Sequence, residues 1–122
     1  MATYGEYWGI PGLVASGTVT QYKIVKAATT AGAVVLASAG SDKILGVLQN
    51  DPASGQEADV AVLGIVKCLA EASVAAGDHV AASTTGRAKT TTSANDHVLG
   101  IAIDASGAAG DLIRVVVAIS NY

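Results

Sequence analysis

The chain has 122 residues and a formal net charge of −3, with 51% hydrophobic residues but only 4% aromatic residues and no phenylalanine. This length fits one domain, and the scattered basic residues argue against nucleic-acid binding or polybasic membrane attachment, which need clustered positive charge. Charged residues make up only 14% and the mean hydropathy is +0.47, so we expect partner subunits to cover part of the surface.

Residues 1–14 differ from the rest of the chain, because they contain three of its five aromatic residues, set between glycines and a proline. Closely spaced Gly and Pro oppose a regular helix. We therefore expect an extended N-terminal arm over residues 1–14, followed by a single domain over residues 15–122. The aromatic rings have two interpretations: they anchor the arm in a pocket of another protein, or they fold back over an open end of the same fold.

The domain is predicted to consist of short β-strands. Residues rich in β-branched side chains, which partly alternate with polar ones, are separated by turns that contain Gly, Asn, Asp or Pro. The predicted strands lie at residues 19–25, 34–37, 44–48, 60–69, 80–82, 87–90, 98–102 and 112–119. Several short strands joined in this way favour an all-β fold, here a single compact β-barrel or sandwich-like domain.

An internal repeat supports this fold class. The segment Ile44-Leu45-Gly46-Val47 is matched by Val98-Leu99-Gly100-Ile101. The other matched blocks, in the same order, are residues 31–35 with 76–80, 53–55 with 105–107, and 60–62 with 115–117. Two pseudo-repeated strand units, each too small to bury its own apolar face, would pack into one core. The alternative is chance similarity in a chain rich in Ala, Gly and Val, and the matched order favours duplication.

Few residues are candidates for catalysis or metal binding. Cys68 has no second cysteine and no nearby histidine, so we expect a buried apolar side chain and neither a disulfide nor a metal site. His79 and His97 each follow an aspartate and could meet across a hairpin, which is the basis of a small-hydrolase alternative. Both lie where a turn leads into a strand, so a structural role is favoured.

Two acidic features also have a functional and a structural interpretation. Residues 50–57 offer oxygen ligands for a cation, but they lack the acidic spacing of a dedicated calcium loop, and a tight turn explains them equally well. Glu57, Asp59 and Glu71 could pair as glycosidase carboxylates do, although a solvated face is favoured. We therefore expect no enzyme activity, no catalytic residues, no cofactor and no metal ligands.

Four motifs occur in order in the second half: Ala-Gly-Asp-x-Val at 76–80, Gly-Arg-Ala at 86–88, Val-Leu-Gly-Ile-Ala at 98–102, and Ala-Gly-Asp-Leu-Ile-x-Val at 109–115. With these motifs, most of residues 19–119 resembles the small capsid-decoration (cement) proteins of tailed bacteriophages. The resemblance implies a compact, tulip-like all-β barrel that sits as a trimer on the outside of the phage head. It also implies a cement role, in which the protein clamps neighbouring major capsid protein subunits after the shell expands.

The expected function follows from this resemblance. We expect a structural virion protein, made in the bacterial cytoplasm, that binds the outer capsid surface as a homo-oligomer. Its expected partner is the major capsid protein, with no direct contact to nucleic acid or membrane. The alternative is a carbohydrate- or host-receptor-binding module of a phage particle, which needs aromatic and polar side chains in one concave site.

The N-terminal arm departs from the shorter beginnings of the family. Its attachment role is therefore expected to be particular to this protein. As a hypothesis, contacts with the capsid or with a neighbouring subunit are made by Tyr4, Tyr7, Trp8, Ile10 and Pro11.

Overall fold

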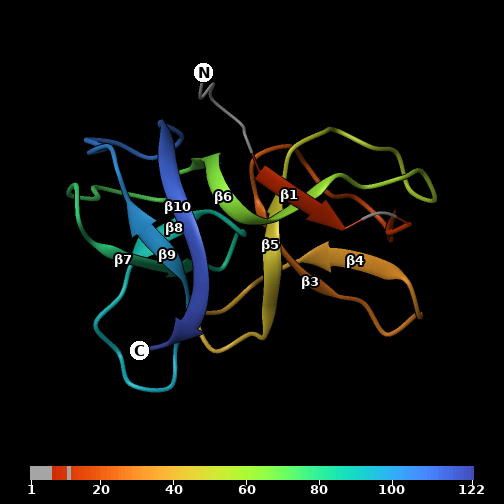
Figure 1. Cartoon of the computed structure of the whole chain (residues 1–122), viewed down its shortest axis with the longest axis horizontal. Coiled ribbons are helices and arrows are strands. Elements are labelled where there is room, and N and C mark those ends of the chain that lie inside the picture. Colours follow the sequence, from red (N-terminus) through yellow and green to blue (C-terminus); the bar gives the residue numbers. More distant parts are fainter. Residues whose placement is uncertain (1–6, 11) are drawn as a thin grey trace.

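A computed structural model describes residues 7–10 and 12–122, which form ten β-strands in one mixed sheet (Figure 1). The strands are β1 (Tyr7–Ile10), β2 (Val14–Ala15), β3 (Ile24–Ala27), β4 (Ala33–Leu36), β5 (Ile44–Leu48), β6 (Val60–Leu69), β7 (His79–Ala82), β8 (Ala88–Thr90), β9 (His97–Ala102) and β10 (Leu112–Asn121). The strands pair antiparallel, except for the short parallel pair of β2 with β4. The all-β prediction is confirmed, and the described residues contain no helix that could cross a membrane.

The predicted strands agree with β3 to β10 to within a few residues, apart from the segment before β3. Residues 19–23 do not continue that strand, because Tyr22 has a φ of 67°, in the left-handed region that interrupts an extended chain. β1 and β2 are not predicted from the sequence, since Gly and Pro between residues 9 and 12 weaken any strand pattern there. β2 spans the predicted boundary between residues 14 and 15, and this division of the chain stays a prediction.

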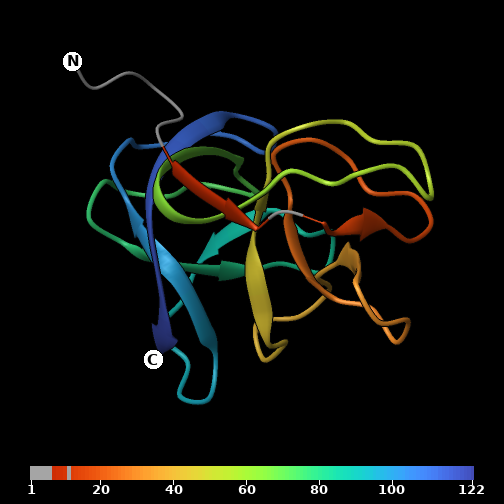
Figure 2. The same cartoon turned by 45° about the vertical axis from the view of Figure 1, so that its right-hand side comes forward.

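β6 connects the two sides of the sheet. Val60 pairs with residues of both β1 and β5, and Gly64 pairs with residues of both β1 and β10. β1 therefore lies on one edge of β6, while β5 and β10 follow each other along its opposite edge. From β6 the order continues through β5, β3, β4 and β2 on one side and through β10, β9, β7 and β8 on the other. β9 and β10 lie side by side in both views of the chain (Figures 1 and 2).

The prediction of a barrel is wrong, because the sheet does not close. β2 and β8, at the two ends of the strand order, have two and three residues, and no pairing joins them in the described part of the chain. The two sides meet through a turn instead. The amide of Ile24, at the start of β3, donates a hydrogen bond of 2.7 Å to the carbonyl oxygen of Gly86, in the turn between β7 and β8. A turn thus occupies the place where a barrel would need a paired strand.

The two sides of the sheet have matching strand orders. β5, β3 and β4 follow β6, just as β9, β7 and β8 follow β10. Gly46 of β5 and Gly100 of β9, which the sequence repeat aligns, both lie against a neighbouring strand: a Cβ atom there would be 2.0 Å from the Ala61 carbonyl oxygen and 1.8 Å from that of Val116. The aligned blocks 31–35 and 76–80, however, contribute to β4 and β7, which do not hold matching places. Duplication of a strand unit therefore stays a prediction.

The interior is filled mainly by Ala and Val side chains. A larger cluster joins β3, β5 and β6 to the strands of the second half, and a smaller cluster lies around Leu48 between β2 and β6. Cys68 is fully buried in the larger cluster, as predicted, and this burial raises the pKa of its thiol to about 12. The core therefore uses small side chains, which allow neighbouring strands to approach closely.

Tyr7 fixes β1 to the sheet. Its ring packs against the larger core cluster, and its hydroxyl donates a hydrogen bond to a carboxylate oxygen of Asp59, the residue before β6. Burial of the phenol, the hydrogen bond and the negative charge of Asp59 together raise the pKa of Tyr7 to about 12. Residues 7–10 of the predicted arm are thus a strand of the sheet, and residues 1–6 and 11 lie outside the described part of the chain.

Replacing Gly100 with alanine should destabilise the fold. The added methyl group would meet the Val116 carbonyl, and overpacking of this kind lowers the free energy of unfolding by about 3 kcal/mol. Gly107→Ala is the matched control, because nothing lies within 4 Å of its Cβ position. Urea unfolding followed by far-UV circular dichroism measures both variants. Equal midpoints for the two would contradict the close approach of β9 to β10.

The raised pKa of Tyr7 predicts a specific loss of stability at alkaline pH. A phenol that holds its proton more tightly in the folded state contributes stability below its ordinary pKa of 10.0, and this contribution is lost as the pH rises through the folded value of about 12. Tyr7→Phe should lack this part of the alkaline loss. Tyr122→Phe, at an exposed tyrosine, should retain it. Urea midpoints measured across this pH range test the prediction, and equal alkaline losses in both variants would contradict it.

Candidate functional site

Large apolar side chains are exposed on the sheet, although the core is built mainly from Ala and Val. Trp8 exposes 76% of its surface and Leu63 exposes 52%. Ile65, Ile101 and Val116 expose 39%, 44% and 40%. We refer to these five residues as the apolar stripe.

Strand register makes the apolar stripe continuous. Trp8 of β1 lies opposite Leu63 of β6. Ile65 lies two residues further along β6, on the same face, and pairs with Val116 of β10, which pairs in turn with Ile101 of β9. Directly opposed residues in antiparallel strands have side chains in contact on one face. The stripe therefore crosses β1, β6, β10 and β9.

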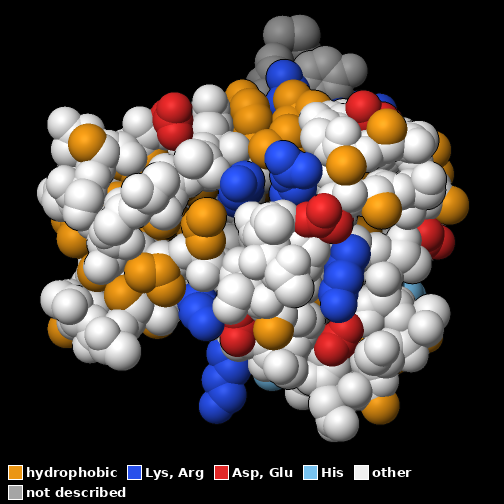
Figure 3. Space-filling model, turned by 180° about the vertical axis from the view of Figure 1, so that it is seen from behind, with side chains coloured by type: hydrophobic (Ala, Val, Ile, Leu, Met, Phe, Trp, Pro, Cys, Tyr) orange, Lys and Arg blue, Asp and Glu red, His pale blue; other side chains and the backbone are white. Residues whose placement is uncertain are grey.

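Charged side chains border the stripe and do not interrupt it. In the next row, Lys67 of β6 pairs with Arg114 of β10. The Arg114 guanidinium donates two hydrogen bonds of 2.8 Å to the carboxylate of Asp104, and these bonds hold the pKa of Asp104 below its ordinary value. Elsewhere on the molecule, acidic and basic side chains lie close together on the face seen in Figure 3. The stripe differs from this face in carrying no charge.

The residues predicted to make contacts divide into three groups. Tyr7 is turned toward the core and packs against the larger cluster. Trp8 points outward into the stripe, and Ile10 is half-buried beside a pocket. Tyr4 and Pro11 lie outside the described residues. The difference between the two neighbouring rings follows from the alternation of side chains along β1.

The sequence contains a signal for the rest of the stripe. Residues 60–66 and 115–117 are apolar at successive positions, whereas a strand with one solvated face alternates apolar and polar residues. Such continuous runs indicate strands that are covered on both faces. In the single chain, one face of β6 and β10 packs on the core and the other carries the stripe.

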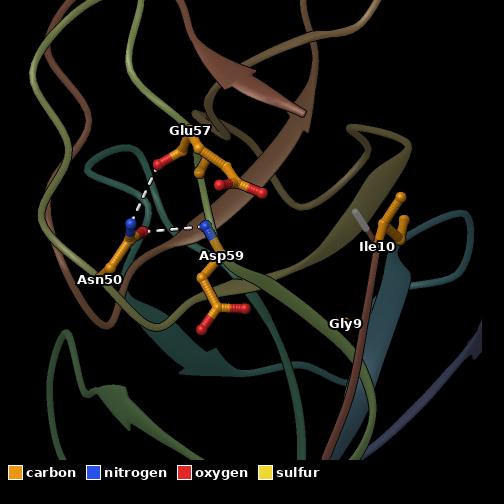
Figure 4. Close-up of a pocket in the computed structure, with 6 residues that line it drawn as sticks. Gly9, Ile10, Asn50, Glu57 and Asp59 are labelled. Carbon is orange, nitrogen blue, oxygen red and sulfur yellow. Dashed lines mark hydrogen bonds between the residues drawn. The ribbon is translucent and has the colours of Figure 1, made fainter. Parts of the chain in front are cut away.

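A pocket beside β1 is lined by Gly9, Ile10, Asn50, Glu57, Ala58 and Asp59 (Figure 4). The Asn50 side chain donates a hydrogen bond of 3.0 Å to the carbonyl oxygen of Glu57 and accepts one of 2.9 Å from the amide of Asp59. Figure 4 shows this side chain between the two segments that it joins. The loop over residues 50–57 is thus held as a hydrogen-bonded turn, which is the structural interpretation of its polar residues.

The two histidines do not converge on one site. His79 lies opposite Ile101, four residues along β9 from His97, which separates them by about 13 Å along the strand. His97 Nδ1 is 3.1 Å from the carbonyl oxygen of Ser41, and the His79 ring meets the Tyr122 ring edge-on with centroids 5.7 Å apart. Among residues 7–10 and 12–122, no group of three or more His, Cys, Asp or Glu side chains could hold a metal ion.

Two of the three carboxylates considered for a glycosidase pair make structural hydrogen bonds. Asp59 accepts the bond from Tyr7 described above. Glu71 accepts hydrogen bonds from the hydroxyls of Thr85 and, at 2.8 Å, Ser83, and these bonds lower the pKa of Glu71. Glu71 therefore stabilises the turn between β7 and β8.

Comparisons with known proteins agree with a structural role. The sequence matches the family described as phage cement protein over residues 14–119. Among solved structures, the chain is similar to the head fiber gp8.5 N base in bacteriophage phi29, with 18% identity, a TM-score of 0.70, and coverage of 90% of this chain and 93% of that chain. No curated protein matches the sequence. Since the family match spans β2 to β10 almost completely, the chain belongs to the phage cement protein family and is a capsid-associated structural protein of a phage virion, not an enzyme.

Proposed function

We propose that the protein binds the outer surface of a phage capsid and acts as cement between major capsid protein subunits. The observation that carries this proposal is the match to the cement family over residues 14–119, and the apolar stripe supports a role in assembly. A contiguous apolar surface of several large side chains often has a binding role, so the stripe supports contact with another protein. Membership of the cement family supports the capsid as the place where the protein acts.

Cement action requires binding and no chemical step. A protein that binds the assembled shell, but not its separated subunits, shifts the equilibrium toward the assembled state by mass action. Many copies that each bridge adjacent subunits combine modest contacts into a large total effect. The proposed form is a homo-oligomer, a trimer by resemblance to the family.

One of the five residues predicted to make contacts in the N-terminal segment has a different role in the structure. Four residues remain proposed contacts with the capsid or with a neighbouring subunit: Tyr4, Trp8, Ile10 and Pro11. Tyr7 is better assigned to the core, because its ring packs there and its hydroxyl binds Asp59. Deleting residues 1–12 would therefore remove a strand of the fold as well as a contact.

The alternative of a carbohydrate- or host-receptor-binding module has less support. Such a module needs aromatic and polar side chains in one concave site. The pocket beside β1 has polar lining residues but no aromatic ring among them, and Trp8 belongs to the stripe.

Heads that lack the protein provide the test of the cement role. Purified protein is mixed with heads from a phage whose copy of the gene has been deleted, and cryo-electron microscopy records whether density is added. We expect added density on the outer surface that contacts two or more major capsid protein subunits, and heads that withstand a higher temperature before they release DNA. Absence of outer density, or unchanged stability of fully decorated heads, would contradict the proposal.

A further inference from the structure

We propose that the apolar stripe is the interface between copies of this chain, so that the protein reaches the shell as a preformed homo-oligomer. This inference rests on the proposed cement function and names the occupant of the stripe. It assigns the exposed faces of β1, β6, β10 and β9 to subunit contacts, and it leaves other surfaces of the oligomer for the capsid.

The composition of the stripe is that of a permanent interface. Its five side chains are uncharged, and one of them is the only tryptophan of the chain. The charged row formed by Lys67 and Arg114 lies at its border, where it would form a polar rim. Interfaces between permanently associated subunits are more apolar than those formed on encounter, and their centres are enriched in aromatic residues and depleted of charge.

The exposed area of the apolar stripe also fits an interface between subunits. The exposed fractions of the five side chains, from 39% for Ile65 to 76% for Trp8, correspond to on the order of 500 Å² of apolar surface. A standard interface buries about 800 Å² on each partner, and about 65% of that area is apolar between identical subunits. The stripe therefore provides the apolar part of one side of such an interface.

A second copy of the chain is favoured over the shell as the partner of the stripe, because the two become available at different times. A surface that binds only the shell would remain exposed to solvent until assembled heads were present. An open apolar surface of this size promotes aggregation. A second copy of the chain is present from synthesis onward and covers the stripe at once.

The fold presents the stripe in a form that suits self-association. Tyr7 holds one side of β1 on the core, and this contact fixes Trp8 on the opposite, outward side. A side chain carried by a fixed strand loses less conformational freedom on binding than one carried by a loop. Oligomers of identical chains have closed rotational symmetry, so the stripe of each copy would contact a neighbouring subunit.

Ile101→Lys and Leu112→Lys form a matched pair for the test, because both side chains are 44% exposed. Ile101 lies in the stripe, whereas Leu112 lies on β10 beyond the Arg114 row. Size-exclusion chromatography with light scattering gives the mass of each protein, and far-UV circular dichroism confirms its fold. We expect the wild type and Leu112→Lys to be homo-oligomers, and Ile101→Lys to dissociate at least 10-fold more readily, toward the 12.0 kDa monomer. Trp8→Ser, at the most exposed of the five positions, is the second variant if Ile101→Lys does not fold.

Decoration of heads separates the two proposals. A wild-type protein that is monomeric in solution but decorates heads would overturn the stripe interface and leave the cement function standing. The same holds for a stripe variant that stays oligomeric but no longer decorates heads, since the stripe would then face the shell. An oligomer that the stripe variants dissociate, but that never binds heads, would support the interface and contradict the cement function.

Discussion

The arrangement of strands around β6 is the constraint on which the rest of the structure depends. β5 and β10 share one edge of this strand in succession, and β1 occupies the other edge. Because β5 and β10 each continue into their own set of strands, β6 joins the two sides of the sheet. The pairing of β1 with the other edge then depends on Tyr7, whose ring and hydroxyl are both held by the fold. The position of Trp8 on the surface is a consequence of that anchor.

The distribution of large and small apolar residues gives the molecule two different kinds of apolar surface. Small side chains fill the core, where Gly46 and Gly100 let neighbouring strands approach so closely that even a methyl group has no space. Larger side chains such as Leu63 and Ile101 lie outside, in a row set by strand register. Burial inside one chain explains the first set. The second set is the surface that we propose to lie between subunits.

Local sequence patterns predict the strands well and their closure poorly. Ile44–Leu48 and Val60–Leu69 are found as predicted, because apolar runs between turn residues are a local signal. Whether the sheet closes depends on contacts such as that of Ile24 with Gly86, which are distant in sequence and leave no periodic pattern. β1 is missed since Gly9 suggests a break, whereas in the fold its missing side chain leaves room for Asp59. The apolar runs of β6 and β10 do not reveal which face of each strand packs on the core and which face carries the stripe.

The short strands at the ends of the sheet have a consequence for a protein held at high density. Sheet edges are templates on which further chains can add strands, and long, flat edges lead to fibrils. β2 and β8 offer only two and three residues for such addition, and β1, which pairs with β6 alone, offers four. Copies that lie close together on a particle therefore have few free backbone groups with which to form hydrogen bonds between their sheets. Association of such copies then depends more on side-chain contacts than on the addition of strands.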